Sequence, residues 1–191
     1  MRYRPEHKAE IHQKIVKDAS RRLRAEGLTG AAVSSVMKDT GLTHGGFYKH
    51  FGSKDELLIE SLSEAFRETA DRLAEAGERS QPGTAWKAVV KAYLSPEHCD
   101  HAERGCPVAA LGSELARADD ATKARLPGEL AKYKSRMLPL MPGRRTADKE
   151  RAFFSIFSTM IGAIELARML PERDMKEKVL ASARDFLLLS F

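Results

Sequence analysis

Apolar side chains recur at intervals of three or four residues along almost the whole chain, and this spacing restricts the fold to packed α-helices. In the first stripe, Ile11, Ile15 and Ala19 predict a helix over residues 4–26, and Gly27 follows where glycine commonly ends a helix. Strand signals are nearly absent, and no β-hairpin pattern occurs. We therefore expect an all-α protein of about nine helices.

Capping residues, proline and glycine mark where these helices begin and end. Ser53 and Glu56 form a capping-box pattern, in which the serine oxygen accepts the amide three residues on and the glutamate reaches back, so a long helix is expected from Lys54. Pro107 suits the first position of a later helix, whereas the polar segment 97–105 is expected to be a loop. The other expected helices lie around residues 33–40, 44–50, 86–94, 130–139, 146–170 and 173–189.

Positive charge is concentrated in the first part of the chain. Residues 1–54 contain 11 Lys and Arg against 5 Asp and Glu, a net charge of +6, while the remainder contains 21 against 22, a net charge of −1. Such asymmetry indicates a basic segment that binds a polyanion, and an acidic protein or a membrane surface would also suit it. Arg2 and Arg4 either extend this segment as an arm along DNA or belong to a loose chain end.

The sequence shows no membrane-spanning segment and no secretory signal. Its longest uncharged apolar segment, residues 152–164, has 13 residues, whereas roughly 20 are needed to cross a bilayer. The basic N-terminus lacks the apolar region of a secretory signal. Two cysteines are too few for a disulfide framework. We therefore expect a soluble, cytoplasmic protein with no membrane partner.

Residues 33–50 have the pattern of a helix-turn-helix: a short helix, a turn at Gly41, and a second short helix that can enter a major groove. The second short helix carries imidazole, hydroxyl and ammonium groups on one face. Gly45 and Gly46 have no side chains, so the backbone there can approach a DNA phosphate closely. The alternative interpretation is a plain turn in a structural bundle, whose basic part contacts an acidic protein.

A family resemblance is carried by residues 41–57, which read GLTHGGFYKHFGSKDEL. This segment resembles the signature of TetR/AcrR-type transcriptional regulators: a glycine turn, an aromatic-Tyr-x-His-Phe core and a Ser-Lys-acidic-Leu helix start. The likeness is strong over about residues 8–60, and beyond them it extends as architecture. One departure is Ala31-Ala32, where the family usually has Thr or Ser at the start of the second helix. That start is expected to be less well capped, with one phosphate contact fewer.

The resemblance implies a homodimer whose two helix-turn-helix units sit in successive major grooves of a near-palindromic operator. It implies a DNA-binding domain over residues 1–53 and a helical ligand-binding and dimerisation domain over residues 54–191. Tyr48 and Lys54 would contact phosphates, and His44, Gly46 and Lys49 would lie nearer the bases. The full set of expected DNA-binding residues is Thr43, His44, Gly45, Gly46, Tyr48, Lys49, His50 and Lys54. No cofactor is expected.

The last two expected helices are rich in apolar residues, and the first of them is apolar around most of its circumference from Phe153 to Ile164. They form either a monomer core or, as the resemblance implies, a four-helix interface with a second copy across residues 146–189. Between the expected DNA-binding part and these last two helices, five residues are expected either to line a cavity for an unidentified small-molecule effector or to belong to the ordinary apolar core. They are Phe66, Trp86, Tyr93, Tyr133 and Met137.

The segment 98–106 contains two histidines and two cysteines and allows three interpretations. A metal site is disfavoured because the paired short spacings of zinc modules are missing, so no metal is expected. Cys106 is the better candidate for a thiol sensor, because it precedes Pro107 at a helix start with Arg104 nearby. The third interpretation is that both cysteines are structural.

Together these features predict a repressor that leaves its operator when a small ligand enters the C-terminal domain, by a shift between two conformations. The alternative is that the protein activates transcription instead of repressing it. The rival hypothesis is a helical enzyme that pairs Cys106 with His98 or His101, and no catalytic signature surrounds those residues. We therefore expect a regulator and not an enzyme.

Overall fold

The computed structural model describes residues 5–29, 36–37 and 44–191, and all regular secondary structure in that part is helical, as predicted. The short second helix expected over residues 33–40 and the turn at Gly41 lie outside the described residues, apart from Val36 and Met37, as do Arg2, Arg4, Ala31, Ala32 and Thr43. The described helices are α1 (Pro5–Glu26), α3 (His44–Phe47), α4 (Lys54–Glu78), α5 (Ala85–Tyr93), α6 (Pro96–Asp100), α7 (Pro107–Leu115), α8 (Asp120–Met137), α9 (Thr146–Arg168) and α10 (Arg173–Ser190), with 3-10 turns η1 (Ala102–Arg104) and η2 (Leu138–Leu140).

The ends of α1 and α4 follow the capping signals. Gly27 has φ +84°, a left-handed conformation that glycine adopts without strain, and its amide donates to the Leu23 carbonyl at 3.0 Å. Ser53 caps α4, because its Oγ accepts the Glu56 amide at 3.1 Å. The Glu56 carboxylate reaches back to the amide of Gly52, one residue before the expected partner.

Two apolar cores occupy the two ends of the described molecule. The smaller core joins α1, α3 and the first turn of α4. We call these three elements the head, and we call the rest of the chain the body. The head core consists of Ile15, Val16, Ala19, Val36, Met37, Phe47, Phe51 and Leu57. The body core begins at Leu23 on α1 and Leu62 on α4, so both helices extend from one core into the other.

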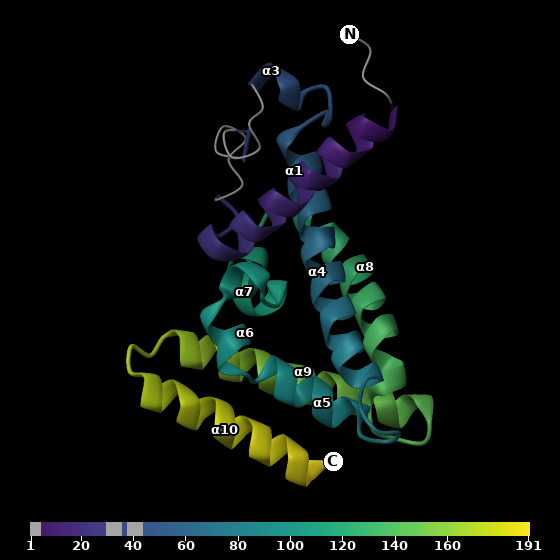
Figure 1. Cartoon of the computed structure of the whole chain (residues 1–191), viewed down its shortest axis with the longest axis vertical. Coiled ribbons are helices and arrows are strands. Elements are labelled where there is room, and N and C mark those ends of the chain that lie inside the picture. Colours follow the sequence, from purple (N-terminus) through teal and green to yellow (C-terminus); the bar gives the residue numbers. More distant parts are fainter. Residues whose placement is uncertain (1–4, 30–35, 38–43) are drawn as a thin grey trace.

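The long helix α4 runs lengthwise through the molecule and connects these cores (Figure 1). It packs along α8 in the body, and α1 crosses it at the head. Helices α9 and α10 lie together at the end opposite α3. Because α7 packs against both α1 and α9, it lies between the head and the far end of the body.

The segment 97–105 is not the loop that its polarity suggested. It contains α6 and the turn η1. Pro96 stands at the first position of α6, and the Ser95 hydroxyl accepts the His98 amide at 3.1 Å, so capping rather than apolar periodicity starts this short helix. Elsewhere, none of the helices in the described part is long and apolar enough to cross a membrane.

The cap at Ser53 can be tested by substitution. Ser53→Ala should lower the free energy of unfolding by about 1 kcal/mol, because the Glu56 amide loses its acceptor. Ser53→Asp should keep the free energy of unfolding within a few tenths of a kcal/mol of the wild-type value, because a carboxylate also caps a helix. Urea unfolding monitored by circular dichroism gives both values. An equal loss in the two variants would contradict the capping role.

Candidate nucleic-acid interface and ligand pocket

The segment from α3 to α4 divides its side chains between the core and the surface. Phe47 and Phe51 are buried and stack with ring centroids 5.4 Å apart, which fixes the turn between them. Backbone bonds from Lys49 to Gly46 and from His50 to Phe47 continue the turn beyond α3. With the two phenylalanines held inside, Tyr48 is 66% exposed and Lys49 is also exposed. The segment therefore presents a phenol and an ammonium group outward from a rigid base.

His50 lies differently from its neighbours, because it is half-buried against α1. Its ring lies 6.2 Å from that of His12, and its Nδ1 is buried without a hydrogen-bond partner in the described part. Burial lowers the pKa of His50, and the nearby His12 and Lys8 lower it further. His12 also stacks on Phe51 and bonds Glu60 of α4 at 2.7 Å, so this corner holds α1 to α4.

Of the other expected DNA-contact residues, Lys54 and Gly46 are described in α4 and α3. Lys54 is exposed at the first position of α4, and Gly46 is half-buried in α3, where its carbonyl accepts the Lys49 amide. His44 and Gly45 begin α3, and their surroundings lie outside the described part of the chain, as does Thr43. The DNA-contact role of this set stays a prediction.

A pocket of about 640 Å³ opens between α7, α8 and α9 in the body. Of the five residues expected to line a cavity, Phe66 and Tyr133 do so. Trp86, Tyr93 and Met137 are buried outside this lining, in the body core. The remaining wall is mostly apolar, with aromatic rings from α9. The lining residues that the sequence did not single out as cavity residues include Cys106, Phe153 and Phe157.

Two buried phenols lie close to Cys106. The Tyr93 hydroxyl lies beside the Cys106 thiol, and the Tyr133 hydroxyl has no hydrogen-bond partner in the described part of the protein. Burial raises the pKa of both tyrosines well above its ordinary value, and the neighbouring Cys106 raises it further. Cys106 is itself 1% exposed and borders the pocket, and its role as a thiol sensor stays a prediction.

His98 is fixed by two backbone groups and cannot act on the Cys106 thiol. Its Nδ1 donates to the Tyr93 carbonyl at 2.6 Å, and its Nε2 accepts the Cys106 amide at 2.9 Å. This pairing requires the neutral ring, and burial lowers its pKa to about 4. His101 instead lies beside the carboxylates of Glu97 and Glu103. The described contacts therefore give no Cys-His pair of the kind the enzyme hypothesis needs.

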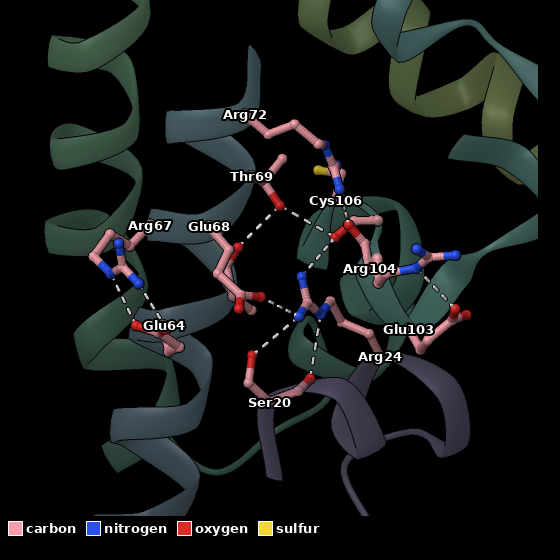
Figure 2. A network of polar contacts seen from close by, with 12 residues as sticks. Ser20, Arg24, Glu64, Arg67, Glu68, Thr69, Arg72, Glu103, Arg104 and Cys106 are labelled. Carbon is pink, nitrogen blue, oxygen red and sulfur yellow. Dashed lines mark hydrogen bonds and ion pairs between the residues drawn. The ribbon is translucent and has the colours of Figure 1, made fainter. Parts of the chain in front are cut away.

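A buried guanidinium connects the head to the body (Figure 2). Arg24 of α1 donates to the Ser20 carbonyl, to the Gly105 carbonyl at 3.1 Å, and to the Glu68 carboxylate of α4 at 2.6 Å. Its side chain is fully buried, so each of these contacts compensates lost hydration. Thr69 also donates to the Gly105 carbonyl, at 3.2 Å. Three elements therefore meet at one carbonyl, which directly precedes Cys106.

Two further contacts hold α7 in place. At its C-terminal end, the Glu114 carboxylate accepts the Leu28 amide at 2.8 Å, just after α1. At its N-terminal end, Arg168 of α9 donates to the Ala109 carbonyl at 3.3 Å, and the same guanidinium bonds the Cys99 carbonyl of α6 at 3.0 Å. Helix α7 is thus bonded to the head on one side and to α9 on the other, while it forms part of the pocket wall.

Comparisons with known proteins agree with this geometry. The family model described as "Bacterial regulatory proteins, tetR family" matches residues 15–60, which include α3 and the start of α4. Over 85% of this chain and 82% of the relative, the sequence is 24% identical to the HTH-type transcriptional regulator TtgR of Pseudomonas putida. Both matches indicate the TetR family.

Two other matches are a relative aligned over about half of the chain and a solved structure with the same fold. The chain is 28% identical to the HTH-type transcriptional regulator LmrA of Bacillus subtilis over 53% of its own length, and the match spans 55% of LmrA. A TetR transcriptional regulator from Chloroflexus aurantiacus has the same fold, with a TM-score of 0.75 and 22% identity over 95% of this chain and 94% of that one.

The family-model match and the named relatives indicate a DNA-binding transcriptional regulator of the helix-turn-helix type. Its relatives are regulators and not enzymes, which removes the Cys-His enzyme as a hypothesis. Among the described residues, no group of three or more His, Cys, Asp or Glu side chains is placed to hold a metal ion.

The buried His98 predicts a pH dependence of stability. An unfolded histidine binds its proton with a pKa near 6.5, whereas the folded value is about 4, so the unfolded state binds more protons between these values. The contribution of His98 is complete above pH 6.5, and about 3 kcal/mol of it is lost as the pH falls to 4.

The measurement is urea unfolding at several pH values between 4 and 7 for the wild type and for His98→Gln, which keeps a donor and an acceptor but does not titrate in this range. The difference between the two free energies should shrink or reverse towards low pH. A constant difference would show that His98 does not titrate as its burial requires.

Proposed function

We propose that this TetR-family regulator is a repressor that binds a near-palindromic operator as a homodimer and leaves it when a small molecule occupies the body pocket. The observation that carries the proposal is the outward presentation of Tyr48 and Lys49 on the buried pair Phe47 and Phe51. A rigid apolar base with polar groups on its outer side is what a groove-reading helix requires.

In this proposal residues 1–53 read DNA and the remainder binds ligand and dimerises. Tyr48 and Lys54 contact phosphates, which fixes the register, while Lys49 lies close enough to base edges to affect sequence preference. Lys54 stands at the start of a 25-residue helix, whose free amides and dipole favour a phosphate. Thr43, His44, Gly45, Gly46 and His50 complete the proposed contact surface.

Dimerisation is proposed through α9 and α10, at the end opposite α3 (Figure 1). The outer side of α9 has a stripe of small and apolar residues spaced by three or four, and a Cβ at Gly162 would meet open space. On α10, Phe186 is 60% exposed and Leu189 is 89% exposed. Exposed apolar side chains on two adjacent helices are typical of an interface between copies. The stripe on α9 consists of Ser155, Thr159, Gly162, Leu166 and Met169.

Release is proposed to pass through α7. This helix contributes Val108 and Leu115 to the pocket wall, and its Glu114 bonds Leu28 just after α1. The Gly105 carbonyl, two residues before α7, receives Arg24 of α1. A ligand that prefers a shifted α7 therefore prefers a shifted head as well. Two heads that no longer match the spacing of successive major grooves lose the operator.

The DNA-binding proposal is tested by two lysine substitutions. Lys54→Ala should weaken binding to all sequences alike and reduce the slope of log affinity against log salt by about 1, because one phosphate contact is lost. Lys49→Ala should change which sequence is preferred in a selection from random DNA. Lys91→Ala, an exposed lysine on α5, is the matched control and should change neither quantity. Sequence selectivity that is unchanged in Lys49→Ala would contradict its assigned role.

The dimer proposal is tested by placing charge on the exposed apolar face. The double variant Leu166→Glu and Phe186→Glu should sediment as a monomer, because two carboxylates per copy would be buried without partners. Its circular dichroism should stay helical, since both side chains are exposed within one chain. Leu130→Glu, an exposed leucine on α8, should leave the sedimentation coefficient unchanged. A double variant that still sediments as a dimer would place the interface elsewhere.

A further inference from the structure

Helix α8 forms one wall of the body pocket and also faces solvent. Four pocket-lining residues of its first two thirds are Lys123, Leu126, Pro127 and Leu130. Leu126 is half-buried, and the other three are exposed. The remaining walls consist mainly of α7 and α9. On the side of α8, a single helix therefore separates the pocket from solvent.

The first half of α8, residues 120–127, has few attachments to the rest of the protein. Its buried residue is Thr122, whose amide and hydroxyl both donate to the Asp119 carboxylate, at 2.8 and 3.2 Å. Asp119 caps the same helix, so these bonds hold the helix start together without fixing it elsewhere. Among the described residues, no side-chain hydrogen bond or ion pair joins residues 120–127 to another helix. Attachment is left to apolar contact, such as that of Leu126 with the body core.

The second half of α8, by contrast, is fixed in the body. Tyr133 is buried in the body core. Arg136 donates to the Glu78 carboxylate of α4 at 2.7 Å, and Lys134 donates to the Glu150 carboxylate of α9 at 2.7 Å. Displacing this half would expose a buried aromatic ring and break both pairs, so it stays with the body.

The two halves meet at Pro127 and Gly128. Proline has no amide hydrogen, so the Lys123 carbonyl, four residues earlier, receives no helical hydrogen bond from it. Glycine is the least favourable helix residue after proline. A Cβ added at Gly128 would meet no atom within 4 Å, so close packing does not require glycine there. The helix is thus weakest where its attached and unattached halves join.

The other walls of the pocket are less free to open. Helix α7 is bonded through Glu114 to Leu28, after α1, and through the Ala109 carbonyl to Arg168 of α9. The rings of α9 in the pocket wall include Phe153 and Phe157, which are buried. Local opening is favoured where few apolar contacts and few hydrogen bonds are lost. Of the three walls, the first half of α8 meets this condition best.

We propose that residues 120–127, here called the lid, turn outward about Pro127 and Gly128 and about the link 116–119, and that this motion admits the effector to the pocket. The inference rests on the proposed function, because the lid serves the same pocket. The cap at Asp119 keeps the lid helical as it turns. Since the second half of α8 does not move, the pocket opens without disturbing the contacts of α4.

The two cysteines report lid opening without a ligand. Both are buried, but Cys106 lines the pocket, whereas Cys99 lies outside its lining, near α10. The full-length protein is treated with N-ethylmaleimide, and labelling is followed by mass spectrometry. Trypsin cleaves after Arg104, so the two thiols are read in separate peptides. Lid opening exposes Cys106 alone, whereas global unfolding exposes both.

Stiffening the hinge should slow the labelling of Cys106. Pro127→Ala restores an amide donor for the Lys123 carbonyl and should slow it by at least about tenfold. Gly128→Ala should slow it by about fivefold, because alanine is the better helix former. Cys99 should label at the same rate in both variants. Pro139→Ala, the same change at an exposed proline outside α8, is the matched control and should leave the Cys106 rate unchanged.

Three results would overturn the lid. They are a Cys106 rate that neither hinge variant changes, an equal slowing of Cys99, and an equal slowing by Pro139→Ala. The labelling uses neither DNA nor effector, so its outcome is distinguishable from that of the proposed function. If Pro127→Ala slows Cys106 alone while Lys54→Ala and Lys49→Ala leave DNA binding unaltered, the lid stands and the proposed function fails. If both lysine variants act as expected and the hinge variants have no effect, the lid is wrong and the proposed DNA contacts stand.

Discussion

The arrangement of head and body depends on one buried charge, the guanidinium of Arg24. Burying a cation is costly unless charge and hydrogen bonds compensate it, and here Glu68, Ser20 and the Gly105 carbonyl supply both (Figure 2). These partners come from α1 itself, from α4 and from the turn before α7. Since Gly105 directly precedes Cys106 in the pocket wall, the carbonyl that Arg24 binds adjoins a pocket-lining residue.

The magnitudes indicate how such a connection behaves when α7 moves. Breaking a buried ion pair by losing one partner costs about 3–5 kcal/mol, whereas couplings between a ligand and a second site are typically about 1–3 kcal/mol. Losing the Arg24 contacts would cost more than a coupling of the usual size, so the proposed route has the head follow α7 as one unit. Glu114 and Arg168 act in the same sense, because they bond α7 to the end of α1 and to α9.

How much of this could be predicted depended on whether the signal is local. Local signals predicted the fold: the periodicity of α1, the cap at Ser53 and the apolar sequence of α9. Helix α6 was missed because a five-residue helix is too short to show a period. Aromatic spacing predicted that Trp86 and Tyr133 are buried, but burial does not tell which ring borders a void. The Arg24 contact with Gly105 spans 81 positions and involves a residue type that is usually exposed, so no sequence pattern pointed to it.

The same contact changes what the charge of the N-terminal segment means. Arg24 is part of the +6 of residues 1–54, yet it is buried and neutralised by Glu68, which lies outside that segment. The segment therefore presents less positive charge to DNA than its composition suggests. Affinity must then come from groups at the surface, such as Lys49 and Lys54, because only exposed cations can displace counterions from a phosphate backbone. Net charge indicated the right partner class, and the position of each cation decides which residues can bind it.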